Sequence, residues 1–266
     1  MRLLVSENGF VHVCGHRGHS FDAPENTMAA FAAAKAKGAT TCEIDMVLTR
    51  DDEIVVAHDI TLDRTTDGKG LIADQDAALI ATLDAGSWCD PRFAGERMPT
   101  LREVLDFART EGLGLTIEIK ERHRIDRLIE CFAALLDDTG MWDEVLLLSF
   151  DHVDLRRAKE QLPRIRTEGI THARHADPVG VARAAELDSL SIELARFHPD
   201  DAHALHAAGI AIRCHVRPPA ELAFHKQYGV DVEPALREWL SAGLIDSLSG
   251  DDVAWLADIV ARSPLR

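Results

Sequence analysis

The chain has 266 residues, 46% hydrophobic and 28% charged, which is ordinary for a folded domain and argues against long disordered segments. Its 45 acidic and 29 basic residues give a net charge of -16, so we expect no nucleic-acid partner and no stable membrane association. Because its five cysteines show no CxxC spacing and the first residues lack the apolar run of a secretory signal, we expect a cytoplasmic protein.

Short β-branched runs alternate with helical patterns along almost the whole chain, which is typical of parallel strands joined by crossover helices. The runs that we expect to form strands are 10–16, 40–48, 114–120, 144–150, 164–170, 189–194, 209–216 and 244–250. Helices are expected between them, for example over 24–38, 177–188 and 200–209. Eight strands in a chain of this length predict an α/β fold of the TIM (β/α)8 barrel type rather than an open sheet.

The connection after the second predicted strand is unusually long, because residues 50–100 separate that strand from the helix expected at Leu101. Its opening, residues 53–59, reads EIVVAHD and predicts a short strand that pairs back onto the second strand. The remainder, about 59–100, predicts a small inserted subdomain over one end of the barrel. Without any linker or repeat, residues 1–266 are expected to form a single catalytic barrel domain with this insertion.

Acidic side chains recur on two neighbouring predicted strands. Glu43 and Asp45 share one face of the second strand, and Glu118 and Lys120 share one face of the next. Acids facing outward would be buried beneath helices, so we expect them to face the mouth of the barrel. Each acid alone could pair with a nearby lysine or arginine, but three carboxylates around one cavity favour a hard divalent cation, Mg²⁺ or Ca²⁺.

Two histidines are expected beside this carboxylate site. His16 ends the first strand and His58 ends the short strand of the hairpin. Histidines at such positions can serve as a general acid and a general base near neutral pH. Arg17 and Lys120 add fixed positive charge, which suits a phosphate group better than a neutral substrate.

Seven stretches in sequence resemble the glycerophosphodiester phosphodiesterase family, in order and with similar spacing. They read HRG, PENT, EIDMVLTRDDEIVVAHD, TLDRTTDGKG, LDAGSW, PTLREVLDF and IEIK. The resemblance covers about residues 12–120 and is weaker beyond, where LLLSFD and the alternation of strands and helices carry it. A chance match to one motif is common, whereas seven matches in order are specific.

The resemblance implies a TIM barrel enzyme of glycerol and lipid metabolism that uses one divalent cation to hydrolyse glycerophosphodiesters to glycerol 3-phosphate and an alcohol. The residues that match the family are the metal ligands Glu43, Asp45 and Glu118, the acid and base His16 and His58, the phosphate contacts Arg17 and Lys120, and the supporting acid Glu25. Glu25 either supports the site or provides a further metal contact. Which histidine is the acid stays open, and so does the nucleophile, water or the substrate's own glycerol hydroxyl. The insertion corresponds to the subdomain that shapes the family's glycerol pocket.

The sequence departs from the family on the last two predicted strands. Where the family commonly has a Trp-Thr pair, this chain has Arg213 and His215, which share a face. We predict that both contact substrate and add positive charge that favours an anionic head group; alternatively, Arg213 pairs with an acid such as Glu193. The final strand reads LIDSLSGDD where a Thr-Asp motif is usual.

Several alternatives remain open from the sequence alone. The substrate could be another phosphodiester or a lysophospholipid, although an aromatic content of 5% offers little to meet a lipid surface. A non-catalytic phosphodiester-binding barrel would not need paired histidines, and an aldolase-like or enolase-like barrel with Lys120 as its active amine would leave HRG and PENT unexplained. The expected partner is a small-molecule phosphodiester. The sequence specifies neither the head group, nor Mg²⁺ against Ca²⁺, nor the oligomeric state.

Overall fold

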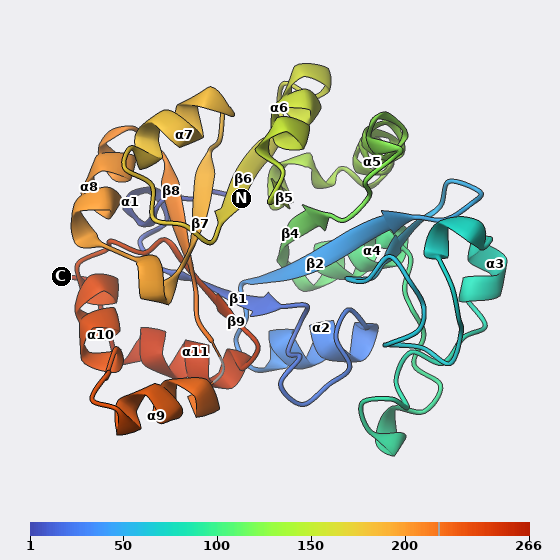
Figure 1. The fold of residues 1–266 in the computed structure, drawn as a ribbon, viewed down its shortest axis with the longest axis horizontal. Helices are drawn as coiled ribbons and strands as arrows, with labels where there is room; N and C mark the ends of the chain where they lie inside the picture. Colours follow the sequence, from blue (N-terminus) through green and yellow to red (C-terminus); the bar gives the residue numbers. More distant parts are fainter. Residues whose placement is uncertain (218) are drawn as a thin grey trace.

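The computed structural model describes residues 1–217 and 219–266, and within them eight parallel strands close into a barrel (Figure 1). The barrel strands are β1 (His12–His16), β2 (Thr41–Leu48), β4 (Gly114–Ile119), β5 (Val145–Ser149), β6 (Arg166–Thr171), β7 (Ser189–Glu193), β8 (Ala211–His215) and β9 (Ser247–Gly250). Pairing of β1 with both β2 and β9 closes the ring. The predicted TIM barrel is therefore confirmed.

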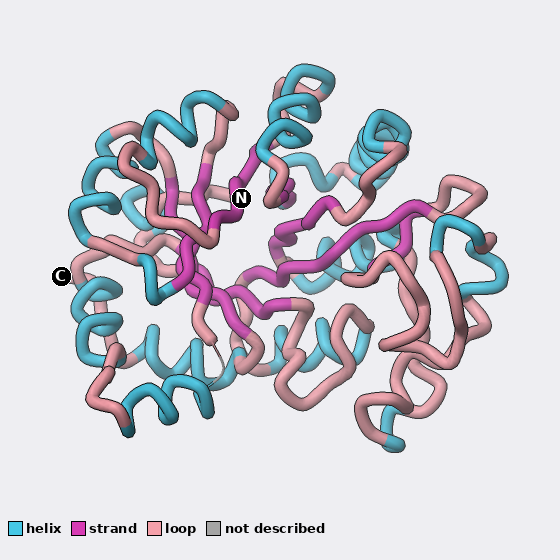
Figure 2. The backbone as a smooth tube through the Cα atoms, viewed as in Figure 1, coloured by secondary structure: helices cyan, strands magenta, loops and turns pink. Residues whose placement is uncertain are grey.

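Helices surround the barrel and cover the outer face of its strands, as the tube in Figure 2 shows. They are α1 (Val5–Asn8), α2 (Met28–Ala36), α3 (Ala77–Ile80), α4 (Leu101–Glu111), α5 (Ile125–Thr139), α6 (His152–Gln161), α7 (Pro178–Ala184), α8 (Pro199–Ala207), α9 (Pro219–Gln227), α10 (Glu233–Ser241) and α11 (Val253–Ala261). Short 3-10 turns are η1 (Ile72–Asp74), η2 (Pro91–Phe93), η3 (Met141–Glu144) and η4 (Leu194–Arg196). Across the described ranges, no helix has the length and apolar character needed to cross a membrane.

The helix expected from Pro24 begins four residues later, at Met28. Thr27 is its N-cap and accepts a hydrogen bond from the Ala30 N–H, while Asn26 has a φ of +59° that no helix allows. The PENT residues therefore form a structured loop in front of the helix instead of its first turn. This loop contributes directly to the site described below.

The long connection after β2 begins with β3 (Ile54–Val56), which pairs antiparallel with β2 as predicted. The chain then forms an insertion that lies beside the far end of β2 in Figure 1 and contains α3, η1 and η2. Its apolar side chains form a small core of their own, separate from the main core between barrel and helices; this core comprises Val47, Val55, Ala57, Leu62, Ile72, Ile80, Ala85 and Met98. This core fixes the start of the insertion, where His58 lies, against the mouth of the barrel.

Candidate active site

Three buried carboxylates meet at the mouth of the barrel. Glu43 and Asp45 lie on β2, and Glu118 lies on β4, opposite Asp45 in the strand register. One oxygen from each of the three lies within 4.8 Å of the others. Burial and the nearby Asp45 charge raise the pKa of Glu43, and the same causes raise the pKa of Glu118 to about 7. Three hard oxygen donors without sulfur or nitrogen could hold Mg²⁺ or Ca²⁺.

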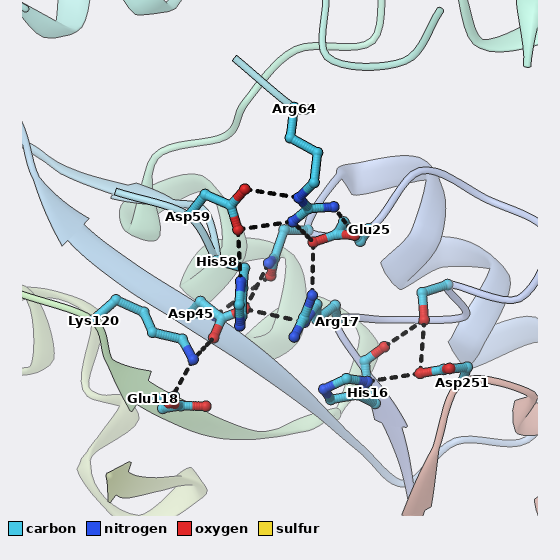
Figure 3. Close-up of polar contacts among 12 residues, drawn as sticks. His16, Arg17, Glu25, Asp45, His58, Asp59, Arg64, Glu118, Lys120 and Asp251 are labelled. Carbon is cyan, nitrogen blue, oxygen red and sulfur yellow. Dashed lines mark hydrogen bonds and ion pairs between the residues drawn. The ribbon is translucent and has the colours of Figure 1, made fainter. Parts of the chain in front are cut away.

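Two cations flank the cluster, and Figure 3 shows Asp45 between them. The Lys120 ammonium donates to Glu118 Oε1 at 2.5 Å and lies 3.3 Å from Asp45 Oδ1. The Arg17 Nε lies 3.5 Å from Asp45 Oδ2. Within the described residues, Asp45 Oδ1 nevertheless accepts no hydrogen bond, although it is fully buried. A buried oxygen without a hydrogen-bond partner costs free energy, so the three carboxylates fit a cation that would bind to Asp45 Oδ1.

The turn after β1 explains the sequence His16-Arg17-Gly18. Arg17 and Gly18 both adopt left-handed backbone conformations, with φ of +57° and +84°. A Cβ atom at Gly18 would lie 2.7 Å from the backbone carbon of Ala30 in α2, so only glycine fits. The turn directs the Arg17 N–H to Glu43 Oε2 at 3.0 Å, which ties the end of β1 to the carboxylate cluster.

The PENT loop holds the cluster from the other side. The Asn26 side-chain amide donates to Asp45 Oδ2 at 2.8 Å, which fixes the rotamer of that carboxylate. Glu25 accepts hydrogen bonds from Arg17 at 2.9 Å and from both terminal nitrogens of Arg64 at 2.7 Å. Burial raises the pKa of Glu25, but the two arginines outweigh it and the pKa is lowered. Glu25 thus binds cationic side chains and lies outside the cluster of three acids.

His16 is anchored by an acid from the last strand's end. Its Nδ1 lies 2.7 Å from Asp251 Oδ1, and the Ser20 hydroxyl donates to the same oxygen at 3.3 Å. Burial lowers the pKa of His16, but the hydrogen bond to Asp251 and the negative charge of Glu43 outweigh it, so the pKa is raised. With Nδ1 engaged, Nε2 is the ring nitrogen left for another partner.

His58 is anchored in the same way by residues of the insertion. Its Nδ1 lies 2.8 Å from Asp59 Oδ1, and Arg64 donates to both Asp59 oxygens at 2.7 and 3.0 Å. The hydrogen bond from Arg64 leads the causes that hold the pKa of Asp59 well below its usual range. Since Arg64 also binds Glu25, a continuous chain of ion pairs runs from His58 to Arg17 (Figure 3).

The positive charge expected from Arg213 and His215 is not what the structure provides, and that part of the prediction is wrong. The Arg213 guanidinium is buried and forms an ion pair with Glu168 on β6, not with Glu193, while donating to Thr116 Oγ1 at 2.9 Å. Burial, followed by the nearby His16, lowers the pKa of His215 to about 3, so its ring is neutral. Whether either side chain contacts substrate stays a prediction.

One cavity of about 360 Å³, called the first cavity below, brings most of the predicted residues together. Its lining includes His16, Arg17, Glu43, His58, Glu118, Lys120, Arg213 and His215. Asp45 and Glu25 do not line it and act through the contacts given above. Predicted residues that lie far apart in the sequence therefore converge on a single site.

Four residues of the site were missed by sequence reasoning. Asp59 and Asp251 hold the two histidines, Arg64 links Asp59 to Glu25, and Asn26 holds Asp45. Asp59 could have been found, because it directly follows His58 in the sequence. Nothing in the sequence pairs Asp251 with a histidine that lies 235 positions away along the chain.

Comparison with known proteins finds similar sequences in one family. The model of the glycerophosphoryl diester phosphodiesterase family matches residues 16–232. A glycerophosphodiester phosphodiesterase of Caldanaerobacter subterraneus is 36% identical over 179 residues, which cover 67% of this chain and 74% of that protein. A putative glycerophosphodiester phosphodiesterase of Bacillus subtilis is 40% identical over 161 residues, 60% of this chain and 66% of the relative.

Solved structures show the same likeness over nearly the full chain. An Oleispira antarctica phosphodiesterase, in complex with the product sn-glycerol-3-phosphate, has a TM-score of 0.81 and 28% identity, with 96% of this chain and 99% of that one covered. A glycerophosphodiester phosphodiesterase from Agrobacterium tumefaciens has a TM-score of 0.78 and 28% identity, over 94% of this chain and 100% of that one.

Proposed function

Because the chain belongs to the glycerophosphoryl diester phosphodiesterase family, as its motifs predicted, we propose that it hydrolyses glycerophosphodiesters to glycerol 3-phosphate and an alcohol. One observation carries the proposal: a buried cluster of three acids and two carboxylate-anchored histidines surround a single cavity. The product named for the Oleispira structure, sn-glycerol-3-phosphate, supports the same reaction here.

Glu43, Asp45 and Glu118 would hold one divalent cation, Mg²⁺ or Ca²⁺. When bound, this cation supplies positive charge that offsets the charge growing on the phosphate oxygens during attack. Arg17 and Lys120 lie beside the cluster and add fixed positive charge at the same place. The phosphodiester is therefore expected to bind with its phosphate beside this cluster, next to Arg17 and Lys120.

His16 and His58 move the protons of the reaction. One ring removes a proton from the nucleophile, which is water or the substrate's glycerol hydroxyl, and the other protonates the departing alcohol oxygen. Asp251 and Asp59 hold each ring by Nδ1, which leaves Nε2 of both rings for these transfers. A barrel that only binds phosphodiesters would gain nothing from two histidines held in this way. Another phosphodiester or a lysophospholipid would use the same phosphate chemistry and differ only in its alcohol groups.

Product analysis tests the reaction directly. The protein is incubated with glycerophosphocholine and Mg²⁺, and we expect glycerol 3-phosphate and choline in equal amounts. Glycerol and phosphocholine as products would show cleavage of the other ester bond, and no product from folded protein with Mg²⁺ or Ca²⁺ would reject the proposal.

Single alanine variants test the two histidines. His16→Ala and His58→Ala should each lower turnover at least about 100-fold, since an acid or base contributes roughly that factor, with an unchanged circular dichroism spectrum. His123→Ala is the matched control, because His123 is exposed and should leave turnover unchanged. Near-wild-type turnover in either of the first two variants would remove that residue from the chemistry.

A further inference from the structure

A second cavity, of about 630 Å³, adjoins the first cavity at the proposed catalytic residues. His58, Glu118, Lys120 and Phe150 line both cavities, whereas His16 lines only the first. A phosphodiester carries two alcohol groups on one phosphorus. With its phosphate at the shared residues, the substrate would place one alcohol group in each cavity.

The first cavity offers hydroxyl groups and little net charge. Ser191 and Ser249 line it, together with the neutral ring of His215, which lies 3.1 Å from the Ser249 hydroxyl. The two arginines on this side are already paired, Arg213 with Glu168 and Arg217 with Glu193 at 3.3 Å. Such a lining of neutral donors and acceptors suits the two free hydroxyls of glycerol, which every glycerophosphodiester shares.

An exposed aromatic side chain, Phe150, lines both cavities. Phe150 is 48% exposed, so part of its ring faces solvent. Its ring stacks on the ring of His172 with centroids 4.7 Å apart, so its orientation is fixed from one side. The remaining ring surface is available to a ligand, and an aromatic face attracts organic cations.

One acid that lines the second cavity, Asp154, has no ion-pair partner among the described residues. The Asp154 carboxylate forms no ion pair and accepts no hydrogen bond within the described ranges, although the side chain is half-buried. Burial, followed by the neighbouring Asp151, raises the pKa of Asp154, and the charge of the nearby Arg157 offsets this only in part. Glu121 also lines the cavity, but the N–H groups of residues 122–124 occupy its carboxylate. Arg122 is exposed, where solvent and salt screen its charge.

We propose that the second cavity is the head-group site and selects glycerophosphodiesters whose head group carries an ammonium ion, with Phe150 and Asp154 as the specificity-determining residues. The inference rests on the proposed function and names its substrate class. It replaces the anionic head group expected from the sequence, because the structure neutralises Arg213 and His215. The glycerol group occupies the first cavity. The insertion residues Asp59, Ile60 and Thr61 line the second cavity and would therefore contact the head group, not the glycerol expected from the family resemblance.

The test compares three substrates that share glycerol and differ in the head group: glycerophosphocholine, glycerophosphoethanolamine and glycerophosphoglycerol. We expect Asp154→Asn and Phe150→Leu to lower kcat/KM for the first two about threefold to tenfold, and to change it less than about twofold for the third. Ser191→Ala should lower kcat/KM for all three alike, since glycerol is common to them. Glu160→Gln is the matched control, because it removes one charge from the exposed far end of the same helix, α6.

The outcome of this comparison is decisive in either direction. If Asp154→Asn and Phe150→Leu lower kcat/KM equally for charged and neutral head groups, the second cavity does not select ammonium. If Ser191→Ala instead changes the ratio between substrates, the head group lies in the first cavity, and the assignment is overturned.

Binding separates this inference from the proposed reaction. Calorimetric titration of glycerophosphocholine into His16→Ala with Mg²⁺ measures affinity without turnover and leaves the second cavity intact. Adding Asp154→Asn should weaken this binding about threefold to tenfold and leave glycerophosphoglycerol binding unchanged. This result would support the head-group site even if the wild-type protein released no glycerol 3-phosphate. Equal binding of the two substrates before and after the substitution would overturn it.

Discussion

The hydrogen bond between His16 and Asp251 allows a sharp test of how the fold prepares its histidines. Asp251→Asn keeps the size of the side chain and removes its charge. The two atoms lie 2.7 Å apart, and the side chains are 27% and 30% exposed. A hydrogen bond between charged groups contributes about 1.5 to 3 kcal/mol, and partial exposure favours the lower value. A residue that holds a reacting side chain in place commonly changes activity tenfold to hundredfold, so we expect kcat to fall by about that factor.

The pH dependence of this variant reports the role of His16. Asp251 raises the pKa of His16 against the opposing effect of burial, so its replacement lowers that pKa. If His16 is the base, it must be neutral, and the acid limb of the kcat profile moves to lower pH. If His16 is the acid, it must be protonated, and the alkaline limb moves to lower pH.

The control for this prediction is Asp258→Asn, an exposed acid on α11 paired only with Arg262 among the described residues. It should leave both kcat and the pH profile unchanged. A profile for Asp251→Asn that coincides with the wild type, with kcat also unchanged, would refute the reasoning, because the contact would then neither orient His16 nor set its charge.

Three further predictions concern the supports of the site. Gly18→Ala should lower the free energy of unfolding in urea by about 2 kcal/mol or more, because its φ of +84° and the α2 backbone exclude a Cβ; unchanged stability would contradict the predicted clash. Arg213→Met should lower the free energy of unfolding by about 3 to 5 kcal/mol, because it leaves Glu168 buried without its partner, and the double variant Arg213→Met/Glu168→Leu should regain most of this stability. If the double variant is as unstable as Arg213→Met alone, the buried ion pair is contradicted. Asn26→Ala should weaken Mg²⁺ binding about tenfold by calorimetry, since Asp45 loses its donor, and unchanged affinity would show that the amide does not position it.

The strands and the carboxylate cluster were predictable because local patterns determine both. Alternation puts Glu43 and Asp45 on one face, and consecutive barrel strands place Glu118 opposite Asp45. The strand ends are less predictable, as β8 shows by beginning at Ala211 rather than residue 209. Hydrogen bonding to neighbouring strands decides these ends, and one sequence carries little information about it.

The partners of the functional side chains were not predictable, because closure of the barrel creates them. Asp251 reaches His16 only because β9 pairs with β1, and nothing local distinguishes it from the other acids of the chain. The error over Arg213 has a related cause. Strand alternation indicates that the Arg213 side chain points into the barrel. It does not indicate that Arg213 forms an ion pair there with Glu168 of β6. Burial also set the charge of His215, which no spacing reveals.

The central claim is that Glu43, Asp45 and Glu118 hold a divalent cation on which hydrolysis depends. Chelator-stripped protein is assayed for glycerol 3-phosphate release from glycerophosphocholine before and after addition of Mg²⁺ or Ca²⁺, alongside Glu43→Gln. We predict no product before addition, full turnover after it, and little recovery in the variant at the same metal concentration. Full turnover by stripped protein, or equal recovery of the variant and the wild type, would contradict the account.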